Sequence, residues 1–310
     1  MVCMPNYGQD KAEDFWVRMT NNNIMVENTI QLSGNHAKYY KTHHPSAKKT
    51  AHFYGGNGFA LGVYQPLIND LAQHLNLTAL TLRGEWHDKP TANTLTREQD
   101  ADLLIEFLQK TQDKPVVGIG HSQGATATAI AAAKCPALFS QLFLLEPVTF
   151  TKQQTLLYNR LPRWLKMTQE PFKSTEQKQA DWRSVEDYYQ YLRQHKAYKR
   201  VSDAHLLTYA NNSLMATADG TLSLRFAPAQ ELANYFGTPF INSALATLIA
   251  AKQVPVHLVI GKPSMFISEK VRQTWDKFVP RESITVLNDY GHLLPLEAPA
   301  LCAKLIIEKC

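Results

Sequence analysis

Short apolar runs recur along much of the chain, separated by stretches with the spacing of amphipathic helices. The runs predict strands at Thr50–Tyr54, Leu77–Leu82, Val116–Ile119, Leu142–Leu145, Val254–Ile260 and Ser283–Leu287. The stretches between them predict helices at Val63–His74, Thr96–Lys110, Ala125–Lys134 and Pro299–Glu308. Wholly apolar strands that alternate with helices are typical of a parallel sheet with both faces covered. We therefore expect an α/β fold with a mostly parallel, doubly wound sheet.

A different pattern precedes these units. Polar and apolar positions alternate over Glu27–Leu32, which predicts a strand with one solvated face. Ala37–Lys41 is its expected partner across the turn at Ser33-Gly34-Asn35. The sheet is thus expected to begin with an antiparallel hairpin.

The alternation of strand and helix breaks between Thr151 and Leu248. This stretch has helical spacing, many charges and no apolar strand run. We interpret it as a helical cap inserted into a core made of residues 1–150 and 249–310. Six of its aromatic side chains are candidates for the roof of a lipophilic pocket or for the cap's own core: Trp164, Phe172, Trp182, Tyr188, Tyr189 and Tyr191.

Composition narrows the class of protein. The chain has 310 residues, 45% of them hydrophobic, and a net charge of +5 without a strong lysine or arginine cluster, which argues against a nucleic-acid partner. Its four cysteines form no C-x-x-C pair and its histidines no H-E-x-x-H motif, so no metal site is implied. No apolar run is long enough for a membrane span or a signal peptide, and the expected location is the cytoplasm.

The segment Gly120-His121-Ser122-Gln123-Gly124 lies between a predicted strand and a predicted helix. This is the setting of a G-x-S-x-G nucleophile elbow, in which a sharp turn lifts the serine hydroxyl clear of the sheet. Flanking glycines leave room for such a turn and tolerate its backbone angles. Ser122 is therefore the candidate nucleophile.

Two other interpretations fit the same glycines. Gly118, Gly120 and Gly124 also follow the spacing of a phosphate loop, and the apolar strand Leu142–Leu145 ends before Glu146, as in a dinucleotide-binding unit. That fingerprint normally opens the first unit of a fold, whereas Gly118 follows several strands. The plainer alternative is a tight turn that needs glycine for packing alone.

A serine hydroxyl needs a base to act as a nucleophile. His292, in a loop after the last predicted strand, is the candidate, with Gly291 before it. Serine before histidine is the chain order of α/β-hydrolases.

Four segments together resemble the α/β-hydrolase superfamily, especially cytoplasmic esterase-like members with a helical cap. They are Tyr54-Gly55-Gly56-Asn57-Gly58-Phe59, Leu82-Arg83-Gly84, Gly120–Gly124, and Gly291-His292 with its Pro-Leu-Glu-Ala-Pro tail. The resemblance runs from about Thr50 to the C-terminus. It implies an oxyanion hole built from the backbone N–H groups of Gln123 and Asn57, with Gly58 as the alternative to Asn57.

The acid is where the chain departs from the family pattern. An aspartate is expected near Ser264, and Gly261–Phe266 contains no carboxylate. The other position known in the superfamily is the end of the preceding core strand, where Glu146 stands. A charge at the end of a buried strand needs a partner, which a histidine supplies. We favour Glu146 as the acid, with Asp289 and a purely structural Glu146 as alternatives.

The expected reaction is hydrolysis of a carboxylic ester through an acyl-enzyme, with a lipophilic small molecule as substrate and no metal or organic cofactor. Hydrolysis of a carbon–carbon bond in a diketone-like substrate by the same Ser122, His292 and Glu146 is the alternative chemistry. A non-enzymatic hydrolase-like binding protein and a dinucleotide-binding protein are the alternatives of other classes. The oligomeric state is not indicated.

Overall fold

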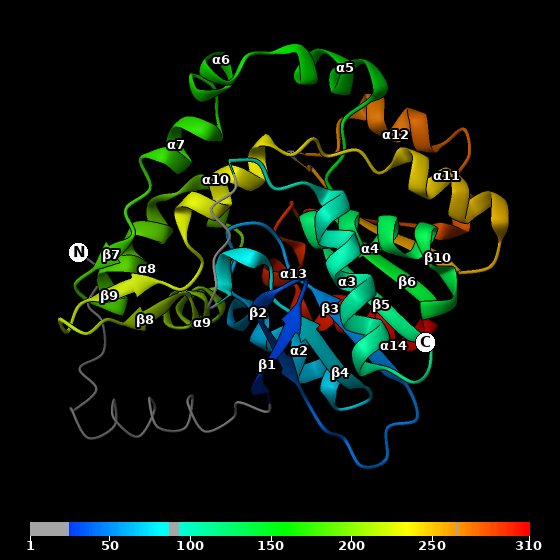
Figure 1. The fold of residues 1–310 in the computed structure, drawn as a ribbon, viewed down its shortest axis with the longest axis horizontal. Helices are drawn as coiled ribbons and strands as arrows, with labels where there is room; N and C mark the ends of the chain where they lie inside the picture. The colour runs from blue at the N-terminus through cyan, green and yellow to red at the C-terminus, as the bar shows by residue number, and fades with distance from the viewer. Residues whose placement is uncertain (1–24, 87–92, 265) are drawn as a thin grey trace.

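The computed structural model describes residues 25–86, 93–264 and 266–310, and an eight-stranded sheet runs through the centre of this part of the chain (Figure 1). In spatial order its strands are β1 (Val26–Leu32), β2 (Asn35–Lys41), β4 (Asn76–Leu80), β3 (Thr50–Tyr54), β5 (Val116–His121), β6 (Phe139–Leu145), β10 (Val256–Lys262) and β11 (Ile284–Asn288). Strand β2 is antiparallel to both neighbours, and the remaining pairs are parallel. The predicted mostly parallel α/β fold is confirmed.

The first two strands form the expected hairpin. Ser33 and Gly34 make the turn with φ of 46° and 82°. Two consecutive residues of positive φ define the turn whose twist matches that of paired strands, and glycine adopts such angles without steric cost.

Helices cover both faces of the sheet. One face carries α2 (Gln65–Ala72) and α14 (Pro299–Lys309), and the other carries α3 (Arg97–Thr111), α4 (Gln123–Lys134), α11 (Asn242–Ala251) and α12 (Glu269–Trp275). Successive side chains of a strand point to opposite faces. In β6, Phe143 and Leu145 therefore join the core under α2 and α14, while Leu142 and Leu144 join the core under α4. This two-sided burial explains why the strand is apolar at every one of these positions.

The predicted helix at Val63–His74 forms in two parts. The chain first makes a 3-10 turn, η1 (Leu61–Tyr64), and α2 begins at Gln65 with Pro66 in its first turn. Proline favours this place because its missing N–H has no partner at a helix start.

Seven helices connect β6 to β10 within the described chain. They are α5 (Lys152–Arg160), α6 (Arg163–Met167), α7 (Phe172–Glu176), α8 (Val185–Gln194), α9 (Asp203–Ser213), α10 (Pro228–Phe236) and α11. Helices α5 to α7 arch over the sheet in Figure 1, whereas α11 packs on α4. The division of the chain into a core and a cap at residues 151–248 stays a prediction.

A small antiparallel sheet also lies in this segment, contrary to the purely helical prediction. Its order is β7 (Asp181–Trp182), β9 (Leu222–Leu224) and β8 (Leu214–Ala216). Strands of two or three residues are too short to produce a recognisable alternation, so the sequence pattern does not reveal them.

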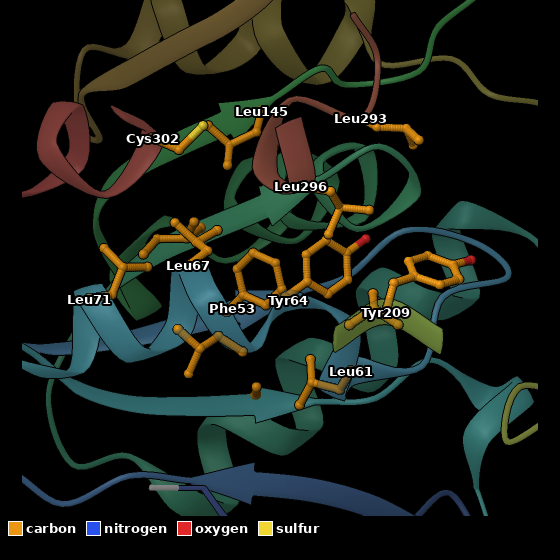
Figure 2. Packing of buried hydrophobic residues seen from close by; sticks show 14 of the residues in the cluster. Phe53, Leu61, Tyr64, Leu67, Leu71, Leu145, Tyr209, Leu293, Leu296 and Cys302 are labelled. Atoms are coloured by element: carbon orange, nitrogen blue, oxygen red, sulfur yellow. The ribbon is translucent and has the colours of Figure 1, made fainter. Parts of the chain in front are cut away.

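Helix α9, in the predicted cap segment, is built into the main core. Tyr209 of α9 lies beside Tyr64 and Leu61 of η1, and these side chains share a buried cluster with Phe53 and Leu67 (Figure 2). The rings of Phe59 and Tyr209 meet edge to face with centroids 5.8 Å apart. Burying Tyr209 thus anchors α9 against the strand-to-helix loop that follows β3.

Candidate active site

Ser122 stands at a sharp turn between β5 and α4, with φ of 54° and ψ of −117°. Positive φ is uncommon for a residue with a side chain, and it persists only where the surrounding structure enforces it. A Cβ atom on Gly124 would lie 2.2 Å from the Tyr54 carbonyl oxygen, and one on Gly120 would lie 2.5 Å from Ala125 Cα. Both glycines are therefore required for α4 to begin directly behind the serine, as expected for a nucleophile elbow.

The structure brings Ser122, His292 and Glu146 into one line of hydrogen bonds. His292 Nε2 is 3.0 Å from Ser122 Oγ, and His292 Nδ1 is 3.2 Å from Glu146 Oε2. All three residues are buried. Because a carboxylate can only accept, the Nδ1–H of the neutral ring donates to Glu146 and the Nε2 lone pair faces the serine hydroxyl. This is the arrangement that a general base requires.

Glu146 directly follows β6 and is 0% exposed. Its Oε1 accepts from the backbone N–H of Gly261 at 2.6 Å, and its Oε2 accepts from Ser264 Oγ at 2.5 Å. These donors and the His292 ring offset the cost of removing the carboxylate from water. Ser264, at the position where the family pattern places an aspartate, thus supports the carboxylate of the neighbouring strand.

Asp289 lies elsewhere. It is exposed in the turn after β11, with φ of 70°, and its backbone N–H donates to the Lys262 carbonyl. Both ring nitrogens of His292 are already engaged by Glu146 and Ser122. The geometry therefore favours Glu146 over Asp289 as the partner of the histidine.

The two expected oxyanion-hole residues both line the cavity beside Ser122. Among the described residues, none accepts a hydrogen bond from the backbone N–H of Asn57 or Gln123. Gly58, the alternative, has φ of 81°, and a Cβ there would lie 2.5 Å from the carboxyl carbon of Glu231. Gly58 therefore makes a tight turn against Glu231 of α10. Its assignment to the oxyanion hole stays a prediction.

A buried polar network that the sequence did not reveal connects these two residues to α10. Asn234 Nδ2 donates to Asn57 Oδ1 at 2.9 Å, and Asn234 Oδ1 accepts from Gln123 Nε2 at 3.0 Å. Gln123 Nε2 also donates to Asp100 Oδ2 at 2.6 Å. Asp100 in turn pairs with Arg83 at 2.8 Å. Helical spacing places Asp100 on the same helix face as Leu103 and Phe107 but does not reveal its partners, and nothing in the sequence singled out Asn234.

A second network supports His292 from behind. His121 Nε2–H donates to the His292 carbonyl oxygen at 2.9 Å, and Tyr64 Oη–H donates to His121 Nδ1 at 2.8 Å. The Tyr64 oxygen accepts from the backbone N–H of Gly56 at 2.8 Å. Burial, with the nearby His292, lowers the pKa of His121 to about 3. In the sequence, this network could have been suspected from His121, which directly precedes Ser122 in the elbow.

A cavity of about 740 Å³ opens over Ser122 and His292. Its aromatic lining consists of Phe59, Phe150, Tyr158, Phe172, Tyr198, Tyr235 and Phe266. Of the six aromatic residues expected as a pocket roof, Phe172 alone is among the described lining residues. Trp182, Tyr188 and Tyr191 stack on one another, and Trp164 is 70% exposed. Most of that roof prediction is wrong, because five of the six rings lie outside the described cavity lining.

The fold and these residues place the chain in a known class of protein. The chain belongs to the alpha/beta hydrolase family, whose sequence profile matches residues 51–305. The dinucleotide-binding interpretation is thereby set aside. No helix within the described residues is long and apolar enough to cross a membrane.

Several particular proteins are similar to this one. The abhydrolase domain-containing protein ACTT2-1 of Alternaria alternata is 23% identical over 226 residues, which cover 63% of this chain and 82% of that protein. E-2-(acetamidomethylene)succinate hydrolase superposes with a TM-score of 0.71 at 18% identity, covering 92% of this chain and 98% of the other. A thioesterase domain from the curacin biosynthetic pathway gives 0.71 at 20% identity, covering 92% and 100%. A Mycobacterium tuberculosis esterase gives 0.68 at 14% identity, covering 96% of each chain.

Proposed function

We propose that this protein hydrolyses a carboxylic ester through an acyl-enzyme formed on Ser122. The observation that carries the proposal is the hydrogen-bonded line from Ser122 through His292 to Glu146 beneath a large cavity. Similar proteins named as an esterase and a thioesterase support hydrolysis at an acyl carbonyl. The seven aromatic side chains in the lining support a substrate with a lipophilic part.

In this proposal each group has a role. Ser122 Oγ attacks the ester carbonyl while its proton moves to His292 Nε2, and Glu146 stabilises the imidazolium that forms. The backbone N–H groups of Asn57 and Gln123 donate to the developing oxyanion. His292 then gives its proton to the leaving alcohol, and the acyl group remains on Ser122. Water attacks the acyl-enzyme by the same steps and releases the acid.

A panel of p-nitrophenyl esters of increasing acyl length tests the reaction. Wild-type protein should release p-nitrophenol, and Ser122→Ala should lower kcat by a factor on the order of 10⁴ or more. A fluorophosphonate probe should label Ser122, as located by peptide mapping. Near-native turnover by a folded Ser122→Ala sample, or labelling at another residue, would refute the proposal.

A further inference from the structure

The lining of the cavity is basic. Four cationic residues of the cap line it: Lys166 of α6, and Lys196, Lys199 and Arg200 in and after η4 (Lys196–Tyr198). Among the described lining residues, two are carboxylates, Glu170 and Glu297. A fifth lining cation, Arg97, is buried and held by Asp100 and Asn234. The cavity lining therefore has an excess of positive charge.

Arg200 lies beside Gly291, the residue that precedes His292. Its Nη1 is 3.3 Å from the point where a Cβ on Gly291 would stand, beside His292. The guanidinium makes no hydrogen bond or ion pair with another described residue. Glu297, whose carboxylate interacts electrostatically with Arg200, already accepts from the Gly291 N–H at 2.6 Å. Arg200 thus keeps its donors available beside the cavity.

The neighbouring lysines extend this positive surface. Lys196 and Lys199 are exposed on either side of Tyr198. The Lys166 ammonium lies 3.8 Å from the centre of the Tyr158 ring. Charges of one sign around a low-dielectric cavity attract an oppositely charged ligand and speed its binding.

We propose that the physiological substrate is an anionic ester or thioester whose carboxylate or phosphate group binds Arg200 with the support of Lys166, Lys196 and Lys199. This inference rests on the proposed function and specifies the substrate class of the same site. A guanidinium binds a carboxylate or phosphate through two parallel N–H donors, which gives orientation as well as affinity.

Matched substrates test this proposal. Mono-4-nitrophenyl adipate and 4-nitrophenyl hexanoate differ by a carboxylate in place of the terminal methyl group, which tests an anion on the acyl side. S-hexanoyl coenzyme A and S-hexanoyl-N-acetylcysteamine test phosphate on the leaving-group side. Wild-type protein should prefer the anionic member of at least one pair in kcat/KM, and added salt should reduce the preference.

Arg200→Gln should reduce that preference about tenfold, which corresponds to about 1.4 kcal/mol. Arg281→Gln changes an exposed arginine outside the cavity lining and should leave the preference unchanged. Equal turnover within both pairs, or an unchanged preference in Arg200→Gln, would overturn the proposal. If neutral esters are hydrolysed through Ser122 in either case, the proposed function itself stands.

A separate observation concerns Asn234, which is 1% exposed on α10. The Asn234 amide donates to Asn57 and accepts from Gln123. It therefore connects the two residues whose backbone N–H groups we assign to the oxyanion. The Asn234 Oδ1 also accepts from Arg97 Nη2 at 3.0 Å, which fixes the orientation of the amide. We infer that Asn234 is a positioning residue through which α10 sets the spacing of these two donors.

Asn234→Asp keeps the size of the side chain and loses the donor to Asn57. We expect kcat to fall by about 10- to 100-fold with little change in KM, because misplaced donors weaken transition-state binding selectively. Asn159→Ala, an exposed cap asparagine that accepts from Thr238, is the matched control and should keep kcat.

Asn57→Ala removes the same hydrogen bond between Asn234 and Asn57 by deleting its acceptor. The effects of Asn57→Ala and Asn234→Asp on kcat should therefore be less than additive when combined. Affinity for a trifluoromethyl ketone analogue should fall in parallel with kcat/KM. Unchanged kcat in folded Asn234→Asp, or full additivity in the double variant, would contradict a positioning role.

Discussion

The carboxylate of Glu146 sits at the end of a buried strand with two donors and a histidine ring around it. Glu146→Gln keeps the shape of the side chain and removes the charge that stabilises the His292 imidazolium. We expect kcat to fall by roughly 10²–10⁴-fold, measured with a short p-nitrophenyl ester.

Asp289→Asn is the control for the alternative acid, since Asp289 is exposed after β11. It should keep most of the activity. A larger loss from Asp289→Asn than from Glu146→Gln would reverse the assignment.

Glu85 is a second buried carboxylate, outside the site. Its Oε2 accepts from the Leu61 N–H at 2.8 Å, and burial raises its pKa from 4.5 to about 7. The folded state therefore holds a proton that the unfolded chain releases. This contribution to stability is complete below pH 4.5 and is lost as the pH rises through 7, by about 3 kcal/mol.

Glu85→Gln cannot release the proton, so its free energy of unfolding should lack this decline between pH 4.5 and 7. Urea titrations across the range measure the difference. Glu98→Gln, at an exposed position of α3, should retain the wild-type slope. The same slope in Glu85→Gln would show that another group causes it.

At the scale of the elements, the start of α4 depends on close contact with β3. A Cβ on Gly124 would meet the carbonyl oxygens of Tyr54 and Gly55 at 2.2 and 2.4 Å. Gly124→Ala should therefore shift α4, lower the free energy of unfolding by about 1–3 kcal/mol and abolish most ester turnover.

Gly220→Ala is the control that introduces backbone strain without a steric clash. Gly220 has φ of 83° but no atom within 4 Å of an added Cβ. The change should cost about 1 kcal/mol and leave kcat intact. Thermal unfolding and kcat of both variants would test the distinction, and equal kcat values would count against the elbow geometry.

The elements that were predictable share a strong local signal. The core strands are mostly apolar because both sheet faces are covered, and the elbow has a glycine pattern that its geometry requires. Asn234 and Asp100 have no such signal, because their roles arise from the packing of α10 and α3 around Gln123. The places of the aromatic residues in the predicted cap could not be predicted either. Phe172 lines the cavity whereas Trp182 packs against Tyr188, and helical spacing does not distinguish the two.

At the scale of the whole molecule, two buried neutral histidines make folding sensitive to acid. Burial lowers the pKa of His52 to about 3, and its Nε2 accepts from the Leu80 N–H at 3.1 Å. His121 shares the lowered pKa. Because the unfolded chain takes up these protons near pH 6.5, the stability present above that pH is lost as the pH falls toward 3.

His52→Gln retains an acceptor for Leu80 and cannot be protonated. Its loss of unfolding free energy between pH 6.5 and 3 should be smaller than that of wild type by about 4–5 kcal/mol at most. His74→Gln changes an exposed histidine and should follow the wild-type curve. Identical acid curves for all three proteins would exclude His52 as a cause of acid unfolding.

The order of the site residues along the chain allows the protein to be split into two fragments that each carry part of the site. Ser122 and Glu146 precede the helices α5 to α11, and His292 follows them. A break at the exposed Asp219-Gly220 turn would leave the nucleophile and its acid on one polypeptide and the base on another. Pairing of β10 with β6, Leu258 opposite Leu144, would then reunite them. Ester turnover would serve as a reporter of fragment reassembly.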